Sequence, residues 1–113
     1  MITKEGFDRG YEWLVARMIG LGAEAMPVVD FVNVTGIGHG GKLFLFMHRK
    51  RLVLKLPEAR AADLCTAGLV QRVQPKSSVQ TSGWVAVSDA DWTVWERLAD
   101  EAHSYARERS FIV

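Results

Sequence analysis

Apolar residues recur at the three- and four-residue spacing of an amphipathic helix in two parts of the chain. The first stripe, within residues 8–20, consists of Tyr11, Leu14, Val15 and Met18. The second stripe, near the other end, consists of Trp92, Trp95, Leu98, Ala99 and Ala102. A third segment lies between Pro57 and Gly68, which suit the start and the C′ position of a short helix. The pattern therefore predicts three helices.

Four other segments are short and rich in β-branched or aromatic residues, which predicts β-strands. They span residues 28–35, 42–48, 51–56 and 84–87, and a polar loop precedes the last of them. The resulting order, α-β-β-β-α-β-α, predicts an α+β fold: an antiparallel β-sheet with helices packed mainly on one face. A length of 113 residues is typical of one domain, so we expect a single domain over residues 1–113.

The two central strands are joined by Arg49-Lys50, which predicts a hairpin with Phe46 opposite Val53 and His48 opposite Arg51. Side chains alternate between the faces of a sheet, so each face can be read from this register. The predicted core face carries Leu43, Leu45, Met47, Leu52, Leu54 and Leu56. The other face carries Lys42, Phe44, Phe46, His48, Arg51, Val53 and Lys55.

The formal net charge of +1 conceals an uneven distribution of charge. Residues 42–60 contain six lysines or arginines and one acidic residue, whereas residues 88–109 contain six acidic residues and three arginines. A nucleic-acid-binding surface that is basic over the whole protein is thereby excluded, but a local basic patch on the central hairpin is expected.

Residues 36–42, Gly-Ile-Gly-His-Gly-Gly-Lys, match both G-x-G-x-x-G and G-x-x-x-x-G-K. Both nucleotide motifs need a helix that begins directly after the glycines. The residues that follow Lys42 are strand-like, and Leu43 stands where a P-loop has its hydroxyl. The pattern therefore favours a glycine turn between antiparallel strands. A small-ligand-binding protein or an enzyme with a site at this glycine loop, near His39 and Lys42, is the alternative.

Candidate chemistry elsewhere is sparse. His39, His48 and His103 have no metal-ligand spacing among themselves or with Cys65, and no catalytic constellation is visible. We therefore predict a protein that is not an enzyme and has no metal or other cofactor. The single cysteine rules out an internal disulfide, and no signal peptide or membrane-spanning run is visible, so we expect a cytoplasmic protein without membrane contact.

The basic hairpin is the strongest candidate for a functional surface. Its cations would contact phosphate or an acidic protein surface, and its aromatics would stack on exposed bases. The residues expected to make nucleic-acid or partner contacts are Lys42, Phe44, Phe46, His48, Arg49, Lys50, Arg51 and Lys55. Two other hypotheses are open: a helix of the same chain covers the aromatic face, or the Phe44/Phe46 face assembles a homodimer.

Three features of the chain resemble the TfoX N-terminal domain family: Gly41-Lys42-Leu43-Phe44, Leu52-Val53-Leu54-Lys55, and Trp84–Val87 before a tryptophan-bearing last helix. YjbR-like proteins share much of this pattern. The resemblance covers about residues 8 to 106. The family's usual Met-Phe-Gly-Gly segment is replaced here by Val34-Thr35-Gly36-Ile37-Gly38. The resemblance implies a compact α+β domain without known catalytic residues. Longer TfoX-like proteins regulate competence genes, and YjbR-like proteins have been suggested to bind DNA.

Overall fold

The computed structural model describes residues 4–27, 35–48, 51–73, 83–87 and 92–111. The helices are α1 (Lys4–Gly20), α2 (Glu58–Thr66) and α3 (Trp92–Phe111). The strands are β1 (Glu24–Pro27), β2 (Thr35–His39), β3 (Lys42–His48), β4 (Arg51–Lys55), β5 (Val70–Arg72) and β6 (Trp84–Val87). The predicted α+β class is confirmed, but the described strands β1, β2 and β5 were not predicted. The predicted strand over residues 28–35 lies almost entirely outside the described residues.

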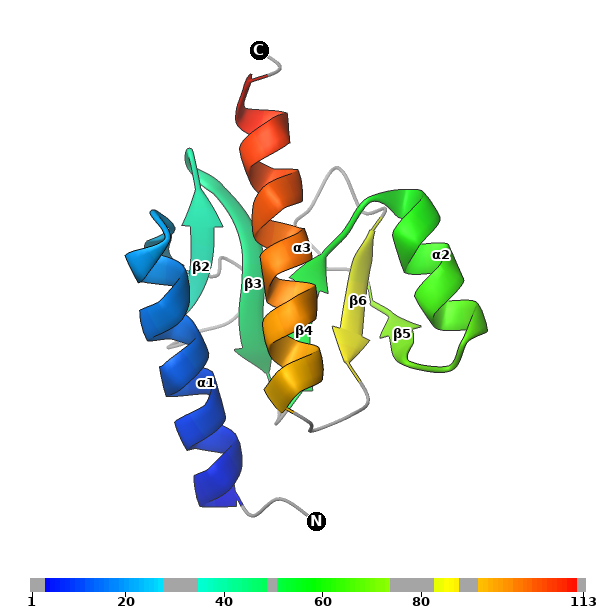
Figure 1. Cartoon of the computed structure of the whole chain (residues 1–113), viewed down its shortest axis with the longest axis horizontal. Coiled ribbons are helices and arrows are strands. Elements are labelled where there is room, and N and C mark those ends of the chain that lie inside the picture. The colour runs from blue at the N-terminus through cyan, green and yellow to red at the C-terminus, as the bar shows by residue number, and fades with distance from the viewer. Residues whose placement is uncertain (1–3, 28–34, 49–50, 74–82, 88–91, 112–113) are drawn as a thin grey trace.

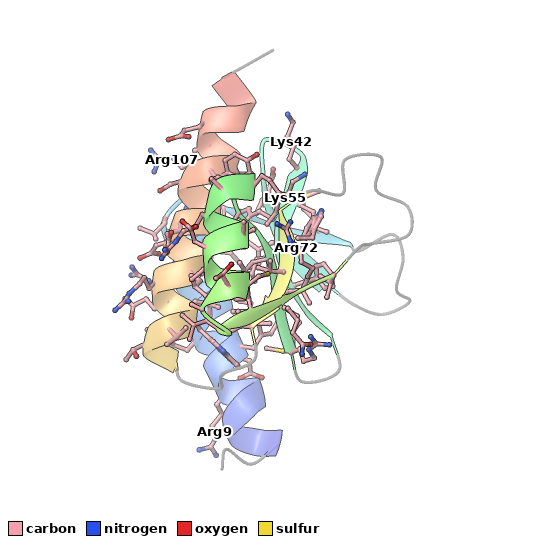
Figure 2. The ribbon with its side chains drawn as sticks, turned by 90° about the vertical axis from the view of Figure 1, so that its right-hand side faces the viewer. Arg9, Lys42, Lys55, Arg72 and Arg107 are labelled. Carbon is pink, nitrogen blue, oxygen red and sulfur yellow. The ribbon has the colours of Figure 1, made fainter. Side chains whose placement is uncertain are left out.

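The strands form one antiparallel sheet in the order β1-β2-β3-β4-β6-β5 (Figure 1). The helices lie on one side of this sheet, as predicted (Figure 2). The main core fills the space between the two layers, where all three helices contribute buried side chains: Leu14 and Met18 from α1, Ala61 and Leu64 from α2, and Trp95, Leu98, Ala99 and Ala102 from α3. The described residues of both apolar stripes therefore lie on helix faces that pack against the sheet.

The β3–β4 hairpin has the predicted register. Phe46 pairs with Val53 and His48 pairs with Arg51, so Arg49 and Lys50 connect the two strands. On the helix side, Leu45, Leu52, Leu54 and Leu56 are buried in the main core, as expected from the alternation of apolar residues. The pattern was therefore sufficient to place most of this hairpin correctly.

A β-bulge breaks the alternation at the start of β3. Ile37 of β2 pairs with Leu45, but the next residue, Gly38, pairs with Leu43, so Phe44 is an extra residue on β3. Phe44 consequently joins Leu45 in the main core, and Leu43 packs against the cluster on the opposite face. The predicted faces of Phe44 and Leu43 are wrong, because a bulge shifts the side-chain period by one residue.

The glycine stretch forms a tight β-turn. His39 pairs with Lys42 across Gly40 and Gly41, whose φ values of 59° and 78° both suit a two-residue hairpin of type I′. Lys42 begins strand β3, so the helix needed by either nucleotide motif is absent from this position. The prediction of a glycine turn between antiparallel strands is confirmed at Gly40 and Gly41, whereas residues 36–39 of the predicted loop belong to strand β2.

Gly83 closes the sheet at the entrance to β6. The amide of Leu56 donates to the carbonyl oxygen of Gly83 at 2.9 Å, and the φ of Gly83 is 89°. A Cβ atom on Gly83 would lie 2.1 Å from the carbonyl oxygen of Leu56. Glycine is therefore required here for both its backbone conformation and its lack of a side chain.

Candidate functional site

The sheet face that points away from the helices has a small apolar cluster of its own. It contains Phe46, Val53, Trp84 and Ala86, with Leu43 and Val73 packed beside them. Phe46 is only 3 % exposed, and its ring centroid lies 5.7 Å from that of Trp84. Phe46 therefore offers no ring surface for stacking on a nucleic-acid base in this structure.

Phe44 is also buried, but on the other side of the sheet. It is 1 % exposed, and its ring stacks on that of His103 from α3 at a centroid distance of 5.3 Å. A helix of the same chain thus covers Phe44, as one of the sequence hypotheses anticipated. Since Phe44 and Phe46 lie on opposite faces and are both buried within one chain, a dimer would gain almost no apolar burial from them.

The predicted cations do not form one patch. Lys55 is 5 % exposed, with its Nζ atom 5.8 Å from the centroid of the Trp84 ring. Lys42 is exposed at the start of β3, and Arg51 is partly exposed at the start of β4. The length of β3, about 20 Å at ~3.3 Å per residue, separates the two. Figure 2 places Lys42 and Lys55 toward the same end of the molecule. Arg49, Lys50 and the side chain of His48 lie outside the described part of the chain.

Among the described residues, Arg17, Arg60 and Arg72 form ion pairs that join elements of the fold. Arg17 of α1 contacts Asp100 of α3 at 2.8 Å. Arg60 of α2 contacts Glu101 of α3 at 2.8 Å. Arg72 of β5 contacts Glu58 of α2, and this contact lowers the pKa of the Glu58 carboxyl. The charges of these arginines are balanced by carboxylates, so we assign them structural roles.

Arg51 is different, because its hydrogen-bond partner is neutral. Its Nη2 atom donates to Oε1 of Gln71 at 2.7 Å, which orients the guanidinium without cancelling its charge. Within the described part of the chain, neither Arg51 nor Lys42 is within ion-pair distance of a carboxylate. In the described part of the β3–β4 hairpin, Lys42 and Arg51 therefore carry positive charges without a carboxylate at ion-pair distance.

A histidine pair lies beside the glycine turn. The rings of His39 on β2 and His103 on α3 meet edge to face, with centroids 5.3 Å apart. Nδ1 of His39 and Nε2 of His103 are buried without a hydrogen-bond partner in the described structure. Burial, and to a lesser extent His39 and Arg107, lower the pKa of His103. We did not predict this pair, although His103 lies four residues after Ala99, on the apolar stripe of α3.

Neither of two cavities lined by described residues includes His39 or Lys42. One, of about 490 Å³, lies between α2 and α3 and is lined largely by charged side chains, including Arg60, Arg97 and Glu101. The other, of about 410 Å³, lies between α1 and β1. Its lining is mainly apolar: Tyr11, Glu12, Val15, Ala16, Ile19, Ala25 and Gly36. We call the second cavity the α1–β1 groove.

Exposed apolar side chains lie along the same part of the molecule as the α1–β1 groove. Ile19, which lines the groove, is 47 % exposed, and Trp13 and Leu21 are also exposed. Sequence reasoning missed this surface because it followed the buried stripe of α1. The signal that could have revealed it is a second set of apolar residues, Trp13, Ala16 and Ile19, at the three-residue spacing of a helix face.

The described residues also bear on metal binding and on membrane-spanning helices. They contain no group of three or more histidine, cysteine, aspartate or glutamate residues that could hold a metal ion. Among these residues no helix has both the length and the apolar character needed to cross a membrane. Cys65 is partly exposed at the end of α2 and is not in a disulfide.

The chain matches no family model, no curated protein and no solved structure. The resemblance to the TfoX N-terminal domain and to YjbR-like proteins therefore stays a prediction that rests on the sequence motifs.

Proposed function

We propose that this chain is a non-enzymatic interaction domain that contacts the phosphate backbone of a nucleic acid through its β3–β4 hairpin. The observation that carries the proposal is the contrast between Arg51 and the arginines at the helix contacts. Arg17, Arg60 and Arg72 are paired with carboxylates, whereas Arg51 is held by the neutral amide of Gln71. A guanidinium that is oriented but not neutralised is suited to binding an external anion.

The proposed contact involves phosphates rather than bases. Phe44 and Phe46 are buried, so base stacking has no described aromatic partner on the hairpin. Arg51 is the centre of the proposed contact, because Lys42, about 20 Å away along the hairpin, pairs with His39 and so lies on the helix side of the sheet. Binding through the backbone alone is independent of sequence and strongly dependent on salt. The sequence resemblance to YjbR-like proteins supports the same proposal.

Titration of fluorescently labelled single- and double-stranded DNA with the protein tests this function, with anisotropy as the readout. Binding at low salt that weakens steeply between 50 and 200 mM salt, as is typical of phosphate contacts, is the expected result. The absence of binding to either DNA form and to a labelled RNA at low salt would contradict the proposal.

Self-association through the α1–β1 groove is a second candidate function, favoured by a different observation. The groove is mainly apolar, and Trp13, Ile19 and Leu21 are exposed on or beside α1. An apolar groove with exposed large apolar side chains beside it is typical of protein–protein contacts. A second copy of the chain would bury these side chains, and the molecular mass in solution tests this directly. This surface replaces Phe44 and Phe46 as the proposed dimer contact.

A further inference from the structure

We propose that the contact between His39 and His103 is a pH-sensitive latch, which holds the β2–β3 turn against α3 when the His103 ring is neutral and releases it in mildly acidic solution. The latch does not involve Arg51 or Gln71, which carry the proposed nucleic-acid contact, although Lys42 lies at the turn that it holds. It rests on three features of the described structure: a buried ring contact, two unpartnered ring nitrogens and a turn built on two glycines.

The ring contact joins two layers of the fold at one point. His103 belongs to α3 and is only 3 % exposed, between the edge contact with His39 and the stacked ring of Phe44. His39 and Phe44 lie on either side of the turn formed by Gly40 and Gly41. The three rings are therefore the place where the end of the β2–β3 hairpin is attached to the helix layer.

The two unpartnered nitrogens make this attachment sensitive to protons. A buried polar atom without a partner carries a desolvation cost, which grows when the ring becomes charged. Nε2 of His103 and Nδ1 of His39 have no hydrogen-bond partner in the described structure. A proton on His103 would therefore remain unsolvated unless the hairpin moved and admitted water.

The charges around His103 favour the neutral ring. His39 faces it from β2, and Arg107 lies four residues later on α3, so two basic groups oppose a positive charge. Asp100, also on α3, acts in the opposite direction, and Phe44 from β3 is uncharged. Lys42 pairs with His39 across the turn, and the Glu24 carboxylate of β1 accepts a hydrogen bond from the amide of Gly41. Figure 2 places Lys42 and Arg107 toward the same end of the molecule.

The sign of the pH effect follows from these contributions. The pKa of His103 in the folded chain lies below its ordinary value of 6.5, first because of burial and then because of His39 and Arg107. In the pH range just below 6.5, the released or unfolded form therefore binds more protons than the closed form. The closed form is favoured above pH 6.5, and its advantage is lost as the pH falls through the pKa of the folded state.

Nuclear magnetic resonance of the full chain between pH 7.5 and 5.0 tests the latch. Nuclear Overhauser contacts between the Phe44 ring and protons of α3 report closure, and the Cε1 proton of His103 reports its titration. We expect the Phe44 contacts to weaken with the same midpoint as the His103 titration, while the amide signals of Ala61 and Leu64 in α2 stay unchanged. Loss of all signals at one midpoint would indicate global acid unfolding and would overturn the proposal.

Three variants separate the latch from a local effect of titration. In His103→Leu the ring cannot be protonated, so the Phe44 contacts should persist to pH 5.0. His48→Gln, which changes a histidine at the far end of β3, is the control: the Phe44 contacts should be lost at low pH as in the parent protein. In His39→Gln the midpoint of His103 should rise, because one opposing basic group is gone. If His103→Leu does not fold, the His39→Gln result decides: an unchanged midpoint overturns the proposal.

Discussion

The ring of Phe44 lies nearly parallel to the ring of His103, with an interplanar angle of 13° and a centroid distance of 5.3 Å. Simple strand alternation would put Phe44 on the opposite face of the sheet, and the bulge between β2 and β3 is what turns it toward α3. One extra residue in a strand thus changes a predicted ligand contact into a contact within the core.

Phe44→Ala should destabilise the fold by about 3–5 kcal/mol, as is typical for removing a large buried aromatic side chain. The cavity would admit water to His103, so the pKa of its imidazole should also rise toward 6.5. Urea unfolding measures the first effect and the Cε1 proton of His103 the second. A control, Phe46→Ala, creates a cavity on the other face and should leave the His103 titration unchanged. Equal His103 titrations in both variants would contradict the assignment of faces.

Arg51→Ala should weaken nucleic-acid binding, because one phosphate contact is lost. The slope of the logarithm of the binding constant against the logarithm of the salt concentration should become shallower by roughly 0.7–0.9. Arg97→Ala is the matched control, because Arg97 is also exposed but lies on α3 in the helix layer, among acidic residues. It removes the same charge from the chain and should leave the slope unchanged. Equal effects of the two substitutions would indicate attraction by net charge alone, without a contact at the hairpin.

Ile19→Asp should lower the mass measured by sedimentation equilibrium at high concentration toward the 12.6 kDa of a single chain. An aspartate in the α1–β1 groove would place an unpaired carboxylate in the apolar contact that self-association requires. Leu69→Asp is the matched control, since Leu69 is similarly exposed, at 42 %, but lies beyond α2. A parent protein that is monomeric over the whole concentration range would contradict self-association through this groove.

Gly83→Ala should cost more stability than Gly68→Ala. Both glycines have positive φ values, 89° and 78°, so either substitution carries backbone strain of about 1–2 kcal/mol. A Cβ on Gly68 meets nothing within 4 Å, whereas one on Gly83 meets the Leu56 carbonyl oxygen. Urea unfolding of the two variants compares these costs. Equal losses would show that the contact between Gly83 and Leu56 relaxes without cost.

The spacing of apolar residues was sufficient to predict the helices and the central strands, because the faces that are buried in the core must be apolar. The described residues of both helix stripes are buried or packed against the core, the apolar residues of β4 are buried as predicted, and the register of Phe46 with Val53 follows from the short connection between the strands. The bulge at Phe44 was beyond this reasoning, because it depends on how β2 meets β3 and leaves no mark in either strand alone. Strand β5 has only three residues, so it has too little sequence to show a period.

The candidate site was less predictable than the fold. Charge counting identified Arg51 and Lys42, but it could not distinguish them from Arg60 and Lys55, because that difference depends on neighbours from distant parts of the sequence. Arg60 meets Glu101 across 41 positions of the chain. The contact between His39 and His103 joins residues even further apart. Pairings of this kind become visible only when the layers of the fold are assembled.

The position of β6 between β4 and β5 determines the order in which the fold can be completed. Within the described sheet, β5 pairs only with β6, although β5 comes first in the chain. During synthesis, β5 and one edge of β4 must therefore wait for residues 84–87, and α3, which covers β2, β3 and β4, is made later still. An exposed strand edge is a site of aggregation. A nascent chain that stalls before residue 84 would therefore be prone to aggregate or to recruit chaperones, even though most of its sheet has already been made.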